Sequence, residues 1–420
     1  MTVLQRIFES LRFAWKAIRS NRQRSLLTML GVGTGIFAIT GILTMVNSLQ
    51  VSVTAGLESL GNTVFFVHNW PWAEETEDWY QFFNRPRMSY GDFLALENGL
   101  NGVEGIMFQA TARGQMVQAN GNSATGVEVN GQTEGASVLG AWALQAGRPI
   151  TQLEYYRGAS VAVLGINVAE SLFPGSSAVG QYFRVGGKRM LVVGVMERRG
   201  QGLVQFGASD DDKVFIPFQK FGSMYALNSR GIDKVIAVKA KEYDNLEFVE
   251  QETIGLIRSA RGLSIRQDNT FSINKQEALM SRFEDVFRYL RIGGIVISIF
   301  SVLIGGFSIG NIMYISVRER TNEIGVQKAL GSARGFILSQ FLTEALMLCI
   351  MGGMIGIAFV GLIGVLVQAV LGTLDLALEV SFSIADLLTG MAVAAFIGLV
   401  AGTIPALMAS KLDPVEAIRM

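Results

Sequence analysis

Histidine and cysteine are almost missing from this chain of 420 residues, which contains one of each, His68 and Cys349. A zinc site of the usual composition needs three or four such side chains, so no metal site is predicted. A single cysteine excludes an intrachain disulfide and leaves the redox compartment open. A single histidine likewise gives no support to catalytic sets built on serine and histidine or on cysteine and histidine.

An excess of charge of either sign is also missing. Lysine plus arginine and aspartate plus glutamate both number 35, so net charge gives no reason to expect a nucleic-acid partner. The nucleotide-binding pattern GxxxxGK[ST] is absent, and the glycine-bearing segments Ser176–Gly180 and Gly186–Lys188 are expected to be turns. We therefore predict that this chain is not an enzyme and binds no cofactor itself.

Long apolar runs are what the chain has instead, since 50% of its residues are hydrophobic. An apolar helix of about 20 residues crosses a bilayer core of about 30 Å. Four runs are long enough, namely Leu26–Leu49, Ile292–Ile315, Phe336–Leu371 and Ile384–Ala409. The third is longer than a bilayer needs, so we expect it to tilt or to break near Gly352–Gly353. The pattern predicts an integral membrane α-helical protein with four transmembrane helices.

The positive charges predict how these helices are oriented. Residues 1–24 have an apolar face, with Trp15, and six cations, which is typical of a helix lying in the membrane interface or packed on the protein's own cytoplasmic ends. Cations also follow the second span and end the chain, so these parts and both termini are predicted to be cytoplasmic. Arg282, Arg288 and Arg291 disagree with this orientation, but they end a long translocated region, where the rule is weak.

Residues 51–287 then form a large extracytoplasmic domain with a mixed α/β pattern. Helices are expected at Tyr90–Asn98, Asn167–Phe173 and Asp244–Arg261. Strands are expected at Val64–Val67, Gly105–Gln109, Ser160–Leu164, Arg189–Val195, Lys213–Ile216 and Lys234–Val238.

Two apolar seams predict a stalk between this domain and the membrane. Leu49, Val53 and Leu57 continue the first span outward. The residues before the second span step by four, three and four, as in a coiled coil, and are Leu279, Phe283, Val286 and Leu290. We expect the two helices to pair.

The segment Val317–Arg334 between the second and third spans reads as a short amphipathic helix or as a solvated loop. Gly331 would suit the end of such a helix, with Lys328 in its last turn. Glu344 follows inside the third span, where a carboxylate is costly. It is expected to form an ion pair with Arg334 or Arg318, or else to mark a proton or substrate site.

Aromatic side chains gather beside four acids in Asn69–Pro86. Trp70, Trp72 and Trp79 belong to this segment. Such a density of aromatic residues is typical of a contact surface for a partner or of a loop that packs on its own domain.

The amino-acid sequence between the second and third spans resembles the corresponding segment of MacB-type and FtsX-like ABC transporter permeases. It reads VRERTNEIGVQKALGSARGFILSQFLTEA. The matching residues are Arg318, Glu319, Arg320, Glu323, Ile324, Gly325, Lys328, Ala329, Leu330, Gly331 and Glu344. In that family the segment is a coupling helix that docks on a separate ATPase. The resemblance implies an ATPase-coupling role for Arg320, Glu323, Ile324, Gly325, Val326, Lys328, Ala329, Leu330 and Gly331.

The resemblance extends over most of the chain. Val161–Val195 with Lys213–Phe218 is similar to the MacB-type periplasmic core domain, and its inserted subdomain is placed at about 124–223. The tail Pro405–Met420 is similar to the family's ending. Pro405 is expected to kink or end the fourth span, and Pro414 to begin a short helix.

The resemblance implies the permease subunit of an ATP-driven transporter in the bacterial cytoplasmic (inner) membrane. It implies a homodimer, a separate ABC ATPase subunit that binds ATP and Mg, and a periplasmic adaptor protein, for efflux or release of drugs, peptides or lipoproteins. The alternatives are a lipoprotein-releasing permease, an FtsX-like regulator of a cell-wall hydrolase, or a membrane sensor without an ATPase. The expected parts are residues 1–24, 25–50, 51–287, 288–316, 317–335, 336–371, 372–383, 384–409 and 410–420.

Overall fold

The computed structural model describes residues 19, 22–58, 61–72, 80–139, 142–199, 209–373 and 380–419. The chain divides into two compact units. The helical unit comprises Met1–Val51, Asp285–Leu374 and Leu378–Met420, and the α/β unit comprises Ser52–Glu284 with Asp375–Ala377. Each unit is described by itself.

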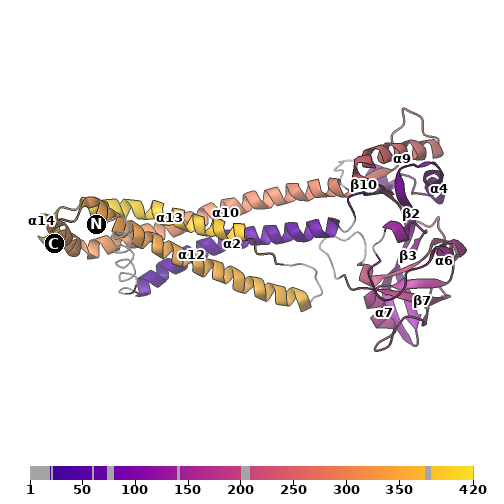
Figure 1. Cartoon of the computed structure of the whole chain (residues 1–420), viewed down its shortest axis with the longest axis horizontal. Coiled ribbons are helices and arrows are strands. Elements are labelled where there is room, and N and C mark those ends of the chain that lie inside the picture. The colour runs from indigo at the N-terminus through magenta and orange to yellow at the C-terminus, as the bar shows by residue number, and fades with distance from the viewer. Residues whose placement is uncertain are drawn as a thin grey trace. The chain divides into compact units, whose positions relative to one another are not determined.

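Long apolar helices build the helical unit (Figure 1). They are α2 (Arg22–Glu58), α10 (Gln276–Glu319), α12 (Arg334–Thr373) and α13 (Ile384–Lys411). Within the described ranges, these 4 helices are long and apolar enough to cross a membrane. They contain the four predicted spans. Two short helices, α11 (Thr321–Ala329) and α14 (Pro414–Arg419), follow α10 and α13.

Glycines let α2 and α12 touch main chain to main chain. A β-carbon added at Gly352 would lie 2.8 Å from the carbonyl oxygen of Met29, and one at Gly356 would lie 2.5 Å from that of Gly33. Both distances are too short for a real β-carbon, so only glycine fits at this crossing. On the other side of α2, a β-carbon at Gly35 would lie 3.2 Å from the carbonyl oxygen of Ser301 in α10.

One alternative in each of two expectations is excluded, namely a break in the third span and an end of the fourth span at Pro405, while a tilt of the third span and a kink at Pro405 stay predictions. The third span does not break near Gly352–Gly353, because α12 runs unbroken to Thr373 and these glycines serve close packing instead. The fourth span does not end at Pro405, because α13 continues to Lys411 with the proline buried inside the unit. A proline removes one hydrogen bond of its helix, and here the packed helix continues through it.

The buried thiol of Cys349 lies in this packed interior. It sits on α12 against α13, where a β-carbon at Gly398 would be 2.9 Å from its sulfur. The thiol of Cys349 therefore occupies the space that a side chain at Gly398 of α13 would otherwise fill.

The α/β unit is built on one sheet of 10 strands. In chain order these strands are β1 (Val64–His68), β2 (Val103–Ala119), β3 (Asn122–Gln132), β4 (Leu144–Gly147), β5 (Val161–Leu164), β6 (Tyr182–Val185), β7 (Lys188–Met196), β8 (Lys213–Pro217), β9 (Ile232–Ala240) and β10 (Ser272–Lys275). Their order is β10-β1-β9-β2-β3-β8-β5-β7-β4, and β6 pairs with both β2 and β7. Because of β6, the strands β2, β3, β8, β5, β7 and β6 close into a ring, called the six-strand ring below.

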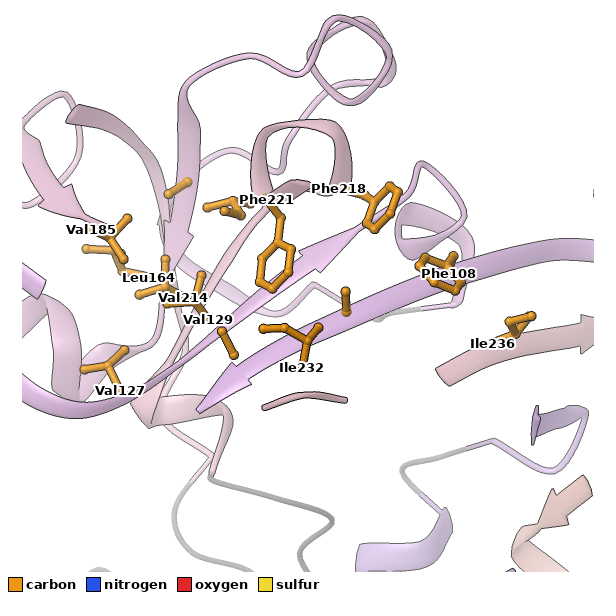
Figure 2. Close-up of a cluster of buried hydrophobic side chains, with 14 of the residues drawn as sticks. Phe108, Val127, Val129, Leu164, Val185, Val214, Phe218, Phe221, Ile232 and Ile236 are labelled. Carbon is orange, nitrogen blue, oxygen red and sulfur yellow. The ribbon is translucent and has the colours of Figure 1, made fainter. Parts of the chain in front are cut away.

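Helices cover this sheet. They are α3 (Tyr80–Phe83), α4 (Tyr90–Gly99), α5 (Ala136–Leu139), α6 (Gln152–Arg157), α7 (Ile166–Leu172), α8 (Phe218–Met224) and α9 (Leu246–Ala260). Figure 2 shows Phe218 and Phe221 of α8 beside Phe108 of β2 and Val129 of β3. A β-carbon at Gly131 would lie 2.3 Å from that of Phe221, so the absence of a side chain there lets α8 lie on the sheet.

An ion pair holds α4 against the end of α9. Arg261 donates to both carboxylate oxygens of Asp92, at 3.0 and 2.8 Å, and both side chains are buried. Burial opposes ionisation of Asp92, but the hydrogen bonds from Arg261 and Ser89 outweigh it and leave the pKa of the carboxyl below its ordinary value.

The predicted helices coincide with α4, α7 and α9, and the predicted strands with β1, β2, β5, β7, β8 and β9. The strands β3, β4, β6 and β10 were not predicted. The boundaries of the inserted subdomain stay a prediction.

Candidate functional site

The segment between α10 and α12 is the candidate site, and its local sequence explains its shape. Arg320 interrupts the helical path with φ −101° and ψ 15°, so α10 ends at Glu319 and α11 begins at Thr321. After Ala329 the amide of Gly331 donates to the carbonyl of Lys328 at 3.0 Å, and that of Ser332 donates to Gln327 at 3.1 Å. With Gly331 at φ +91°, this is a Schellman motif. The helix is thus capped by Gly331, as predicted. It is shorter than the predicted amphipathic helix Val317–Arg334, because α11 covers only Thr321–Ala329.

Three polar contacts lie at this segment: two tie it to α12 and α13, and one joins α2 to the end of α10 directly before it. Arg24 of α2 donates two hydrogen bonds to Glu319, at 2.6 and 2.7 Å. Arg320 lies 3.3 Å from the carboxylate of Glu344 in α12. The ammonium of Lys328 donates to the carbonyls of Ser410 and Leu412, at 2.7 and 2.5 Å, where α13 ends. A lysine at this place also interacts favourably with the helix dipole of α13.

The predicted ion pair between Glu344 and Arg334 is wrong. Glu344 is buried, with its side chain 8% exposed, and it pairs with Arg320. Arg334 begins α12 almost three turns before Glu344, about 15 Å along the helix axis, and is exposed. Arg320 reaches Glu344 because the chain turns back on itself at the start of α11.

The two sides of α11 have different surroundings. Ile324 and Gly325 are buried in the helical unit, whereas Val326 is 45% exposed and Leu330 is 84% exposed. Glu323 is exposed as well. We call Glu323, Val326, Ala329 and Leu330 the outer face of α11. Ile324 and Leu330 therefore do not share one apolar stripe, because Ile324 packs inward and Leu330 projects from the C-terminal cap.

The stalk residues are partly buried. Val53, Leu57 and Leu279 are buried, and Phe283 and Leu49 are half-buried. Val286 and Leu290, which were expected in the same seam, are 52% and 44% exposed, and Phe287 is buried instead. The buried side of α10 therefore steps by four residues from Leu279 to Phe283 to Phe287. Pairing of the two stalk helices stays a prediction.

Trp70 and Trp72 pack on their own domain. Trp70 contacts Phe83 edge to face, with ring centroids 5.2 Å apart. The amide of Trp72 donates to Asn274 Oδ1 at 2.8 Å, and Asn274 Nδ2 donates back to the carbonyl of Trp70 at 3.0 Å. These contacts favour the packing alternative for both residues. Trp79 lies outside the described residues, as do residues 1–18, and a partner contact there stays a prediction.

His68 has a structural role beside them. Its Nδ1 accepts the amide N–H of Trp70 at 3.1 Å, and its Nε2 lies 2.9 Å from the carboxylate of Asp233. Burial opposes ionisation of Asp233, yet the contacts with His68 and the charge of Arg113 lower its pKa. Over the part of the chain that the structure describes, no group of three histidine, cysteine or acidic side chains could hold a metal ion.

The sequence did not predict the ion pair between Arg24 and Glu319, which lies next to the segment between α10 and α12. Arg24 was counted only among the cations of the N-terminal helix, and Glu319 was named only as part of the family spelling. Their opposite charges lie near the start of α2 and at the end of α10. The pair could have been predicted from these positions, because both helix ends lie on the same side of the membrane in the predicted topology.

Comparisons with known proteins agree with this layout. The model of the MacB-like periplasmic core domain matches residues 25–255, and the FtsX-like permease C-terminal model matches residues 295–414. Four membrane-spanning helices with a large extracytoplasmic domain between the first two therefore define an ABC transporter permease. Because the first match covers more than half of the chain, the chain belongs to the family with a MacB-like periplasmic core domain.

Two relatives show how far the similarity reaches. The macrolide export ATP-binding/permease protein MacB of Bdellovibrio bacteriovorus is 28% identical over 99% of this chain and 62% of its own length. The uncharacterized ABC transporter permease YknZ of Bacillus subtilis is 27% identical over 98% of this chain and 99% of its own length. This chain thus spans about three fifths of the MacB relative.

Two solved structures are also similar. The periplasmic region of MacB from Actinobacillus actinomycetemcomitans has a TM-score of 0.44 at 14% identity, covering 55% of this chain and 97% of that one. The extracellular domain of YknZ has a TM-score of 0.38 at 15% identity, covering 50% of this chain and 98% of that one.

Proposed function

We propose that this permease couples ATP hydrolysis by a separate subunit to movement of its extracytoplasmic domain. The movement would drive efflux or release of drugs, peptides or lipoproteins. The family membership supports the permease class, and the anchored inter-span segment supports the coupling. An FtsX-like regulator would instead carry a bound cell-wall hydrolase or its activator.

The arrangement of α11 is the observation that carries this proposal. Arg320 at its start pairs with Glu344 of α12, and Lys328 in its last turn donates to the end of α13. The pair of Arg24 and Glu319 joins α2 to the end of α10, which directly precedes α11. Its outer face projects Leu330 and Val326. A force applied to that face would therefore reach α12 and α13 through these contacts, α10 through the chain itself, and α2 through the ion pair at the end of α10. An exposed apolar side chain at such a place suits insertion into a groove of a partner.

The separate ATPase is inferred from the sequence and its relatives. The sequence has no GxxxxGK[ST] pattern. The chain is similar to YknZ, which is named an ABC transporter permease, over 99% of that protein's length. We place ATP and Mg on the partner ATPase.

The charges support a cytoplasmic location for α11. Arg24, Arg320, Lys328 and Lys411 gather where α2 starts and α10 and α13 end. An excess of cations is typical of the cytoplasmic side. We accordingly propose a multi-pass protein of the bacterial inner membrane with both termini cytoplasmic, acting as a homodimer with a periplasmic adaptor.

The docking test replaces Leu330 with aspartate. Leu330→Asp places a charge on the outer face without disturbing the buried side of α11, so we expect loss of co-purification with the co-expressed cognate ATPase and loss of ATPase stimulation. Ala333→Asp is the matched control, since it adds the same charge at the exposed N-terminal cap of α12, which accepts aspartate. Full ATPase binding and stimulation by Leu330→Asp would refute the docking assignment.

The stalk test uses cysteine pairs. Leu57→Cys and Leu279→Cys place thiols on two buried stalk positions. If the stalk helices pair, the double variant forms a disulfide on mild oxidation, and the pair Leu57→Cys with Val286→Cys, whose second position is exposed, forms none. Equal cross-linking of the two pairs, or no disulfide in either at any nucleotide state, would count against the paired stalk.

A further inference from the structure

Six ladders of paired strands form the six-strand ring, and the ladder between β2 and β6 is one of the two shortest, the other being that between β5 and β8. Two residue pairs join β2 to β6, Val117 with Val185 and Gln118 with Arg184. Beyond them β2 turns away at Asn120 and Gly121, whose φ angles are +49° and +88°. A groove of about 570 Å³ opens where the strands part, lined by residues 118–123, residues 181–184 and Arg189.

Like charges stand opposite each other on one wall of this groove. Arg184 on β6 is the direct cross-strand partner of Arg189 on β7. A third cation, Lys188, lies on β7 next to Arg189 but does not line the groove. Like charges placed directly opposite on a sheet destabilise it. None of the three cations has an ion-pair partner among the described residues, and the lining contains no acidic residue. Arg148, Arg198 and Arg261 of the same unit, by contrast, each pair with an acid.

The arginine at the centre of this wall is held in place. The guanidinium of Arg189 lies 3.9 Å from the centroid of the Tyr182 ring. Tyr182 is itself 47% exposed, so ring and guanidinium together present a flat surface to the groove. Such stacking fixes the orientation of an arginine and leaves its N–H groups available to a carboxylate.

The main chain beside these cations is an open strand edge. On one side β6 pairs with β7 along its whole length, from Tyr182 to Val185. On the other side its pairing with β2 covers Arg184 and Val185 alone. In an antiparallel pair alternate residues direct their main-chain groups to the same side, so Phe183 and Val185 face β7 whereas Tyr182 and Arg184 face the groove side. Among the described strands none pairs with Tyr182 on that side. A free edge of this kind accepts an added strand.

We propose that this groove binds an extended acidic segment of a partner protein. The segment would pair its main chain with β6 at Tyr182, and its carboxylates would receive hydrogen bonds from Arg184 and Arg189. A groove of about 570 Å³ with a strand edge suits a polypeptide rather than a single inorganic anion. The proposal concerns the α/β unit and does not depend on docking of an ATPase to α11.

The test titrates the full-length protein in nanodiscs with a fluorescent peptide of four Glu-Val repeats and follows anisotropy. The wild type should bind it, and Arg184→Gln with Arg189→Gln should weaken binding at least tenfold. Arg157→Gln with Arg230→Gln is the matched control, because it removes two charges from exposed positions of the same unit outside the groove. That control should bind within about twofold of the wild type.

Two further measurements test whether the loss of binding reflects unfolding of the variant and whether the groove binds a simple anion. Arg184→Glu with Arg189→Glu should bind a peptide of four Lys-Val repeats that the wild type does not bind, a gain that an unfolded variant would not show. Inorganic phosphate should not displace the Glu-Val peptide at concentrations near that of the peptide. Equal binding by wild type and the glutamine double variant, no gain by the reversed variant, or displacement by equimolar phosphate would each overturn the proposal.

Discussion

The anchor between Lys328 and the end of α13 gives a prediction that can be worked out from the structure. Lys328→Met keeps most of the aliphatic side chain and removes the ammonium that donates to the carbonyls of Ser410 and Leu412, at 2.7 and 2.5 Å. Those carbonyls close a helix whose last turn has no further residues to satisfy them. The variant should therefore loosen the end of α13 and its contact with α11.

The size of the effect follows from the two hydrogen bonds. A hydrogen bond to a charged group contributes about 1.5–3 kcal/mol. Lys328 is only half-buried, so water can replace part of what the variant loses, and we expect a net cost of about 2 kcal/mol. Since 1.4 kcal/mol is a factor of ten, local opening of the last turn should become about thirty times more frequent.

Hydrogen–deuterium exchange of the full-length protein in nanodiscs measures this opening. Amides near the end of α13 should exchange about thirtyfold faster in Lys328→Met. Lys411→Met is the matched control, because Lys411 ends the same helix but is exposed. Its loss should change exchange by about twofold or less. If the two variants exchange alike at this helix end, the anchoring role of Lys328 is refuted.

Three further predictions concern other parts of the chain. Arg320→Met should destabilise the helical unit by about 3 kcal/mol in thermal unfolding, because it leaves the buried Glu344 carboxyl without its partner. Adding Glu344→Gln should restore most of the loss, and no recovery in the double variant would argue against the pair. Gly356→Val should separate α2 from α12, since a β-carbon there would stand 2.5 Å from a carbonyl oxygen, and the unfolding temperature should fall. Gly361→Val in the same helix should leave it nearly unchanged, because no atom lies within 4 Å of a β-carbon at that position. The hydrogen bonds from Arg148 lower the pKa of Glu154 to about 2, so the stability that this pair contributes is present above about pH 4.5 and is lost as the pH falls towards 2. Glu154→Gln should flatten that acid dependence by about 1 kcal/mol, less than the full shift implies because Arg148 is half exposed, and an unchanged profile would contradict the assignment.

The membrane spans could be predicted from the sequence because the signal is local. An uncharged run such as Leu26–Leu49 has few alternatives to a buried helix, and Gly331 adopts the left-handed conformation that its position at a helix end predicts. The same holds for the amphipathic helix α9 and the β-branched strand β5.

The missed features depend on contacts distant in sequence. The partner of Glu344 could not be chosen between candidate arginines until the turn at Arg320 was known. A helix as short as α11 is too brief for periodicity to separate Ile324 from Leu330. The strand β3 contains glycine, asparagine and serine, which have low strand propensity, and is held by its neighbours β2 and β8.

The solitary cysteine has a practical consequence. Cys349 is fully buried between α12 and α13, so a water-soluble maleimide should leave it unmodified in the folded protein. Any cysteine introduced at an exposed position then becomes the sole labelled site without removal of the native one. Pairs of spin labels or fluorophores on the α/β unit and on α11 could thus report distances during a transport cycle in an otherwise unaltered chain.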